Sequence, residues 1–214
     1  MTLLPFRIGI TGSIATGKST AVKELRTLGC KIIDADEIAR TLFHKYHVAY
    51  YLLWLFFGKQ VFEKDQVDRK KLASIVFNNP SKRKTLNLIT HPFVISKMFL
   101  QYLYHVVSRS KYVFFDIPLL YESNLDRYMN QVWVIYVDEE TQKNRLLSRM
   151  RSESFAHSTS DLTFDEHEML KRISSQMSIE DKKLKATVVV KNTGSLMELQ
   201  ERIRYLVSCL ENDC

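Results

Sequence analysis

The sequence predicts an α/β fold in which a parallel sheet is covered by helices. Strand signals and helix signals alternate along the chain, which is typical of strands joined by helical crossovers. Five short runs are nearly continuous in apolar residues, and such runs indicate strands buried on both faces. They are residues 6–10, 31–36, 112–116, 132–137 and 187–190.

A glycine-bearing turn follows the first predicted strand. Residues 12–20 match G-x-x-x-x-G-K-[ST], and a helix over residues 21–28 is expected to end at Gly29. A strand, a glycine loop and a helix N-terminus direct backbone N–H groups towards one point, which suits a polyphosphate. Lys18 would reach the outer phosphates and the Ser19 hydroxyl would bind Mg²⁺. The motif therefore predicts a nucleoside triphosphate site.

The composition is that of an ordinary globular protein. The 214 residues suffice for one domain or for a core with an inserted subdomain, with 45% hydrophobic and 26% charged residues. Three cysteines without metal-ligand spacing indicate a reducing compartment, so we expect a cytoplasmic protein. The apolar residues 49–57 are too few to span a membrane and predict a buried helix instead.

The net charge of +7 does not indicate nucleic-acid binding, because basic residues are spread along the chain and mixed with acidic ones. Phosphate-binding side chains and a solvated surface account for the excess of basic residues.

About seventy residues between the second and third strands have helical, aromatic-rich character. They are too many for a simple crossover and predict an inserted substrate-binding subdomain.

Three aspartates lie at the ends of predicted strands, where open α/β sheets bind their ligands. Asp34 and Asp116 are expected to be functional, because a carboxylate after an apolar strand needs a partner. Such a residue can hold Mg²⁺ through water, accept a proton or bind a substrate hydroxyl. For Asp36, capping of the following helix and contact with the substrate are equally good interpretations.

Two arginines, Arg145 and Arg149, share a face of the helix predicted from about residue 139 to 151. A polar stretch, residues 152–161, separates them from Arg172 in a further helical segment. Inward-facing arginines on both sides of a mobile loop are typical of a lid that closes over phosphates. A solvated arginine face is the alternative interpretation.

These motifs together resemble those of the dephospho-CoA kinases. The similarity covers nearly the whole chain and rests on residues 12–20, 33–40, 57–58, 68–69, 91–92, 116–122, 142–145, 172–176 and 192. The blocks Asp-Ala-Asp-x-Ile-Ala-Arg and Pro-Leu-Leu-x-Glu are more specific than the glycine loop.

The resemblance implies a three-layer P-loop NTPase of the nucleotide-kinase type with a five-stranded parallel sheet. The single kinase domain would have a core at residues 1–36, 110–149 and 179–214, a helical CoA-side insertion at 37–109 and a lid at 150–178. The implied reaction is ATP-dependent phosphorylation of the ribose 3′-hydroxyl of dephospho-CoA, the last step of coenzyme A synthesis. The implied cofactors are ATP and Mg²⁺, without a nucleic-acid or membrane partner, in a monomer or small homo-oligomer.

The resemblance also implies roles for individual residues. Lys18, Asp34 and Arg145 would be catalytic, and Asp34 would orient or deprotonate the attacking hydroxyl. ATP would be bound by Gly12, Ser13, Ile14, Ala15, Thr16, Gly17, Lys18, Ser19, Thr20, Arg149 and Asn192, the last of these near the adenine. The acceptor would be bound by Asp34, Asp36, Arg40, His91, Leu119 and Glu122. Mg²⁺ would be bound by Ser19 and, through water, by Asp116.

The chain departs from the family pattern at three places. Ser13 and Ala15 occupy loop positions where the family often has glycine, which limits the freedom of the backbone there. The stretch between Arg149 and Arg172 is longer than usual, and residues 186–187 lack an acid that the family usually has before the last strand.

His91 precedes a proline, so the residues alone predict an extended turn with a surface imidazole.

Two alternatives remain open. One is another small P-loop kinase that acts on a nucleoside or sugar hydroxyl. The other is a GTPase or ATPase switch. The switch is disfavoured because the chain has no Asn-Lys-x-Asp motif and continues as Asp-Ile-Pro after its third strand.

Overall fold

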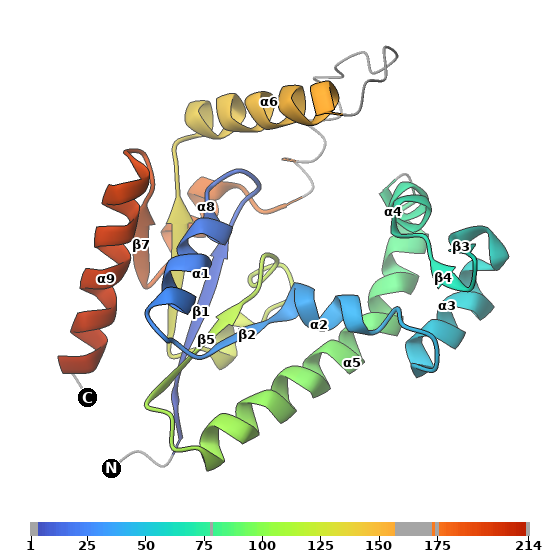
Figure 1. The fold of residues 1–214 in the computed structure, drawn as a ribbon, viewed down its shortest axis with the longest axis horizontal. Coiled ribbons are helices and arrows are strands. Elements are labelled where there is room, and N and C mark those ends of the chain that lie inside the picture. The colour runs from blue at the N-terminus through green and yellow to red at the C-terminus, as the bar shows by residue number, and fades with distance from the viewer. Residues whose placement is uncertain (1–3, 78, 157–172, 174–175, 213–214) are drawn as a thin grey trace. The chain divides into compact units, whose positions relative to one another are not determined.

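The computed structural model describes residues 4–77, 79–156, 173 and 176–212 (Figure 1). The chain divides into two compact units, one of Met1–Ile32 with Arg109–Cys214 and one of Ile33–Ser108. Our boundaries for core, insertion and lid stay a prediction. Most of the predicted lid, residues 157–172 and 174–175, lies outside the described residues.

A five-stranded parallel sheet forms the framework, with four strands in the first unit and β2 at the boundary between Ile32 and Ile33. Its strand order is β2-β5-β1-β6-β7, and the α/β prediction is confirmed. The strands are β1 (Phe6–Gly12), β2 (Ile32–Asp34), β5 (Tyr112–Asp116), β6 (Gln131–Tyr136) and β7 (Val188–Lys191). In the register, Ile10 of β1 lies opposite Asp116 of β5, and Gly12 lies opposite Ile135 of β6. The end of the first strand therefore lies between the ends of two neighbouring strands.

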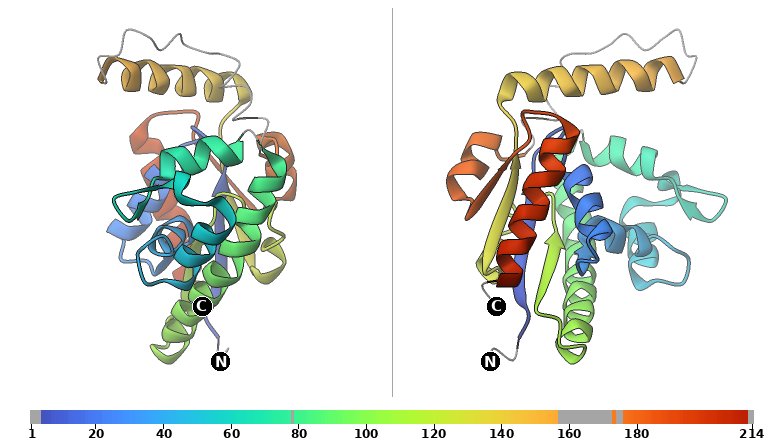
Figure 2. Two further views of the ribbon diagram at one scale, coloured as in Figure 1. Left: turned by 90° about the vertical axis from the view of Figure 1, so that its right-hand side faces the viewer. Right: turned by 60° about the vertical axis from the view of Figure 1, so that its left-hand side comes forward.

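One face of the sheet is covered by α1 (Lys18–Thr27) and α9 (Leu196–Asn212), and α9 lies along the sheet in Figure 2. Ile8 and Ile10 of β1 point into this layer and are fully buried. The helices contribute Leu25 and Ile203 to the same core. Because alternate residues of a strand point to the same face, this layer uses the even-numbered residues of β1.

Odd-numbered residues of β1 point to the opposite face. A Cβ atom at Gly9 would lie 2.8 Å from Leu120 and 3.0 Å from Met129, so the segment after β5 packs directly on the backbone there. The short helix α8 (Ile179–Lys185) contacts this side through Tyr136 of β6. Helical layers on both faces give the three-layer arrangement expected from the sequence. The described first unit also contains α6 (Glu139–Ala156) and the 3-10 turn η2 (Asp126–Tyr128).

The second unit is mainly helical, as predicted. It contains α2 (Ala35–Thr41), α3 (Val48–Phe57), α4 (Arg69–Phe77) and α5 (Pro80–Val107), with the 3-10 turn η1 (Lys59–Val61) and a small hairpin of β3 (Phe62–Glu63) and β4 (Gln66–Val67). A separate core joins these helices.

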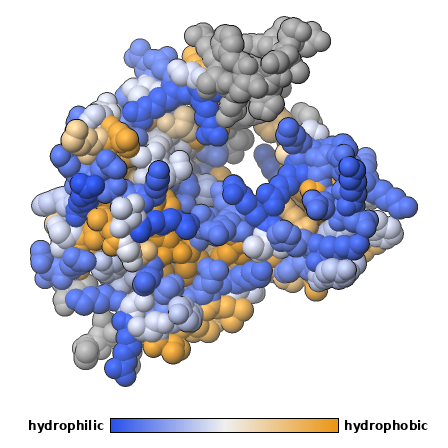
Figure 3. All heavy atoms as spheres, viewed as in Figure 1, coloured by the Kyte–Doolittle hydropathy of each residue, from blue (hydrophilic) through white to orange (hydrophobic). Residues whose placement is uncertain are grey.

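Figure 3 shows that hydrophilic residues cover much of the visible surface of the molecule, with hydrophobic patches between them. Among the described residues, no helix is both long and apolar enough to cross a membrane.

Three local expectations were wrong. The second strand ends at Asp34 rather than Asp36, and Asp34 caps α2 by accepting a hydrogen bond from the Glu37 amide at 2.9 Å. His91 and Pro92 lie inside the long helix α5 and not in an extended turn. Helix α3 buries only one face, and Tyr51 and Trp54 are 53% and 50% exposed.

The backbone of the glycine loop contains one unfavourable residue. Ala15 has a φ of 63°, in the left-handed region that costs a residue with a side chain about 1–2 kcal/mol. Ala15→Gly would remove this strain, although glycine loses about 0.5–1 kcal/mol more conformational entropy on folding. We expect Ala15→Gly to be as stable as the wild type or more stable by up to about 1 kcal/mol, measured by urea unfolding.

A matched control is Ala21→Gly, at a buried position in the middle of α1. It should lower the free energy of unfolding by about 1 kcal/mol or more, since the helical backbone gains nothing from glycine. An equal loss in both variants would contradict the left-handed strain at Ala15.

Candidate functional site

The loop between β1 and α1 forms the base of the candidate site (Figure 1). Gly17 is the N-cap of α1 and has a φ of 90°, a conformation that glycine adopts without strain. It provides no side-chain hydrogen bond to the first turn, and that turn contains no acidic residue. The first N–H groups of a helix have no partner inside it, and the helix dipole favours an anion there.

Two interior side chains bind carbonyl oxygens of this loop. The Gln142 Nε2 of α6 donates to the Ile14 carbonyl at 2.8 Å, and the Asn192 Nδ2, just after β7, donates to the Thr16 carbonyl at 2.8 Å. Gln142 is 2% exposed and Asn192 is 7% exposed. The loop is therefore held from the inside by residues more than 120 positions away in the sequence.

The same contact explains why position 17 must be glycine. A Cβ atom at Gly17 would lie 2.2 Å from the Asn192 Nδ2, and one at Gly12 would lie 2.6 Å from the Thr16 Oγ1. Both distances are too short for nonbonded atoms. The Thr16 hydroxyl in turn donates to the Ser13 carbonyl at 2.9 Å and closes the turn.

Lys18 and Asp116 form an ion pair at the end of the central strands. The Lys18 side chain is 17% exposed and the Asp116 side chain is 7% exposed. The sequence predicted both residues for this site, and the structure brings them together. An ammonium in the first helical turn, beside a carboxylate, provides charges of both signs where a magnesium-bound polyphosphate needs them.

A second ion pair lies behind the loop and was not anticipated. Lys182 of α8 is completely buried, and its Nζ lies 3.0 Å from the Glu122 Oε1. The same carboxylate oxygen accepts a hydrogen bond from the Met177 amide at 2.9 Å. Glu122 was expected to bind the acceptor. Its side chain, which pairs with buried Lys182, is itself 22% exposed, and its contact with an acceptor stays a prediction.

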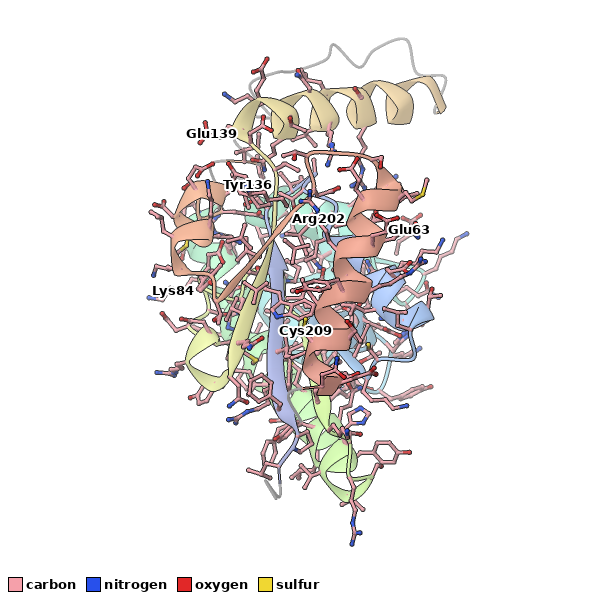
Figure 4. The ribbon with its side chains drawn as sticks, turned by 90° about the vertical axis from the view of Figure 1, so that its left-hand side faces the viewer. Glu63, Lys84, Tyr136, Glu139, Arg202 and Cys209 are labelled. Atoms are coloured by element: carbon pink, nitrogen blue, oxygen red, sulfur yellow. The ribbon has the colours of Figure 1, made fainter. Side chains whose placement is uncertain are left out.

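A hydrogen-bonded group on α8 completes the surroundings of the loop. Tyr136, near the carboxyl end of β6 in Figure 4, donates to the Glu180 Oε1 at 2.5 Å. This hydrogen bond raises the pKa of the phenol and lowers the pKa of the Glu180 carboxyl. Lys183 lies 4.3 Å from the centre of the Tyr136 ring. The hydrogen bond between Tyr136 and Glu180 anchors α8, the helix that carries Lys182, to the sheet.

The other predicted acceptor residues lie mainly in the second unit. Asp34 is the last residue of β2, Asp36 and Arg40 lie on α2, and His91 lies in the middle of α5. Asp36, Arg40 and His91 are exposed. Leu119, in the first unit, is 45% exposed. Their contact with an acceptor stays a prediction.

The two predicted lid arginines lie on α6, as expected. Arg145 is half-buried and Arg149 is exposed. Residues 157–161 of the polar stretch, and Arg172, lie outside the described residues. The predicted lid closure therefore stays a prediction.

Sequence reasoning missed the roles of two residues at this site. Gln142 belongs to the recognised Gln-x-x-Arg motif, one helical turn before Arg145, but nothing local indicates that its amide binds the loop. Lys182 lies among several lysines in α8. Its position facing the interior depends on the three-dimensional packing of that helix.

Known proteins with similar sequences bear on this geometry. A sequence model of the dephospho-CoA kinase family matches residues 6–198. A dephospho-CoA kinase of Carboxydothermus hydrogenoformans is 40% identical over 204 residues, which are 95% of this chain and 93% of that protein. A dephospho-CoA kinase domain-containing protein of Danio rerio is 37% identical, over 98% of this chain and 86% of that protein.

Solved structures agree with the sequence relatives. The structure of a dephospho-CoA kinase from Campylobacter jejuni has a TM-score of 0.64 and 27% identity, covering 98% of each chain. A crystal structure from Thermus thermophilus has a TM-score of 0.75 and 31% identity, covering 96% of this chain and 97% of that one. The family match over most of its length, with relatives of about 40% identity, shows that this chain belongs to the dephospho-CoA kinase family.

Proposed function

We propose that the loop of residues 12–17 binds the phosphates of Mg²⁺·ATP and that Asp34 acts on the attacking hydroxyl. Family membership makes the chain an ATP-dependent phosphotransferase that acts on dephospho-CoA. The residue roles, the metal and the ribose 3′-hydroxyl as acceptor are our proposals. The observation that carries them is the uncapped N-terminus of α1, with Lys18 and Asp116 beside it.

The proposed step forms one P–O bond and breaks another. The 3′-hydroxyl oxygen of dephospho-CoA attacks the γ-phosphorus, the bond between that phosphorus and the β–γ bridging oxygen breaks, and ADP leaves. The proton of the hydroxyl passes to the Asp34 carboxylate. Lys18 stabilises negative charge on the transferred group, with Arg145 and Arg149 acting from α6.

The donor set at the loop suits Mg²⁺. The Ser19 hydroxyl and the Asp116 carboxylate are oxygen donors, and Mg²⁺ in such sites takes one or two protein groups, substrate phosphates and water. We found no cluster of three or more His, Cys, Asp or Glu that could hold a metal ion among the described residues. Ser19 would bind the metal directly and Asp116 through water, and the bound metal would neutralise phosphate charge.

For the acceptor we propose binding by Asp36, Arg40, His91 and Leu119, with charge supplied by Arg40. The aromatic side chains of α3 offer apolar surface to the pantetheine arm, since Tyr51, Trp54 and Phe56 are each at least half exposed.

We further propose that Asn192 lies near the adenine, that the enzyme is cytoplasmic, and that it is a monomer or a small homo-oligomer. Burial raises the pKa of the Cys30 thiol, which fits a free thiol of low reactivity.

One prediction of the proposed function concerns the acceptor. Purified enzyme with Mg²⁺·ATP should convert dephospho-CoA to CoA, with kcat/KM for adenosine lower by on the order of 10² or more. Adenosine keeps the reacting hydroxyl but lacks the remote groups whose binding energy positions it. AMP, shikimate and gluconate complete the comparison. Equal turnover of adenosine or a sugar acid would contradict the proposal.

Another prediction of the proposed function concerns Asp34. Asn is also a good N-cap, so Asp34→Asn should keep α2 capped while removing the base. We expect kcat to fall by about 10² to 10⁴ with the KM for ATP unchanged. The matched control is Asp36→Asn, in the first turn of the same helix, which should mainly raise the KM for dephospho-CoA. Normal kcat with lost ATP affinity in Asp34→Asn would indicate a metal-binding role instead.

A further inference from the structure

Lys182 is a buried cation for which the proposed reaction has no direct use. Its ammonium has three oxygen neighbours: the Pro118 carbonyl at 3.0 Å, the Glu122 Oε1 at 3.0 Å and the Gly12 carbonyl at 3.4 Å. Three acceptors match the three N–H donors of an ammonium group. Burial lowers the pKa of Lys182, and the Glu122 carboxylate opposes this by favouring the charged form. A charge at a fully buried position is costly unless it is paired in this way.

These oxygens come from two segments that the reaction must keep in register. Gly12 ends β1 and begins the phosphate loop. Pro118 and Glu122 belong to the segment directly after Asp116, which ends β5. The Thr11 hydroxyl also donates to the Pro118 carbonyl, at 2.9 Å. Lys182 therefore connects the start of the loop with the segment that follows the carboxylate paired with Lys18.

The carboxylate of Glu122 completes the connection. It binds both Lys182 and the Met177 amide, so the segment after β5 is joined to the residues just before α8. Ser13 contacts the same place, since its hydroxyl donates to the Met177 carbonyl at 3.4 Å. All of these groups belong to the first unit of the chain.

We propose that Lys182 is a positioning residue for phosphoryl transfer, which sets the distance between the phosphate loop and the segment of residues 116–122, and that Glu122 acts through Lys182. The proposal rests on the function proposed for the loop. Lys182 does not touch the substrate. Its ammonium keeps Lys18 and Asp116 aligned with the phosphates, and a shift of about 1 Å in such groups can cost on the order of 10² in rate.

The test compares Lys182→Met, which keeps a long side chain but removes the charge, with Lys183→Met on the same helix. Lys183 is partly exposed and pairs with Glu180 at 3.1 Å. For folded Lys182→Met, checked by circular dichroism and melting temperature, we expect kcat to fall by about 10 to 10². Its KM for dephospho-CoA should change by less than about threefold, because no acceptor contact is lost. Lys183→Met should keep kcat within about twofold of the wild type, as is usual for partly exposed ion pairs.

Glu122→Gln and the double variant, which combines Lys182→Met with Glu122→Gln, test whether the two residues act through one contact. Glu122→Gln should lower kcat with an unchanged KM for dephospho-CoA, and the double variant should be no slower than Lys182→Met, because both residues act through one contact. Wild-type kcat in folded Lys182→Met overturns the proposal, as does an additive loss in the double variant. A raised KM for dephospho-CoA at normal kcat in Glu122→Gln overturns it too, and would assign Glu122 to the acceptor.

Three further outcomes are distinguishable. If Lys182→Met does not fold, the kcat and KM of Glu122→Gln alone support or overturn the proposal by the same criteria. If the wild-type enzyme forms no CoA from dephospho-CoA and ATP, the proposed function fails, and the positioning role fails with it. Normal wild-type activity together with an undiminished kcat in folded Lys182→Met overturns the positioning role alone.

Discussion

The conformation of the phosphate loop depends on hydrogen bonds that buried side chains donate to carbonyl oxygens of its backbone. Lys182, Gln142 and Asn192 bind the carbonyls of Gly12, Ile14 and Thr16. The remaining bonds are local, with the Ser13 carbonyl bound by the Thr16 amide and hydroxyl and the Gly17 carbonyl by the first turn of α1. In a trans peptide the N–H group points away from the carbonyl oxygen. Carbonyls directed inwards therefore leave the following N–H groups directed outwards, where an anion can bind.

Charge adds to this arrangement. The loop lies at the positive end of α1, Lys18 is in its first turn, and the ammonium of Lys182 lies behind its first residue. The carboxylates of Asp116 and Glu122 pair with these two lysines. Each ammonium is thus paired at low exposure with a carboxylate, one at the end of β5 and one in the segment that follows it. Residues 116–122 therefore contribute two carboxylate side chains to the site, and the path of their backbone places those side chains beside the lysines.

Much of the first unit could be predicted from the sequence because its signals are local. Apolar runs gave the five strands to within a few residues, and the glycine motif gave the loop and α1. Boundaries failed where two local choices were similar in energy. Asp34 and Asp36 can both cap a helix, and the helix begins after the first of them. At His91 a proline preference was overridden, since Pro92 lies within a helix of 28 residues, shortly after the buried Ile89 and Thr90.

The interior partners of the loop could not be predicted in the same way. Gln142, Lys182 and Asn192 are far from the loop in sequence, and their side chains reach it only once β6 has paired with β1, β7 has paired with β6, and α6 and α8 are in place. The left-handed φ of Ala15 is another example, because the fold imposes a conformation that the residue itself disfavours. The sequence indicates which residues can bind phosphate, and the packing of the sheet determines how the backbone is held.

The central claim is that interior hydrogen bonds keep the loop ready for phosphate, and Gln142→Leu tests it most directly. The buried leucine removes the donor to the Ile14 carbonyl while keeping a side chain of similar volume. Calorimetric titration with Mg²⁺·ATP should show an affinity lower by about tenfold in a variant that keeps its fold, since a buried hydrogen bond is worth roughly 1 kcal/mol and an unsatisfied carbonyl costs more. Wild-type affinity for ATP in folded Gln142→Leu would contradict the account.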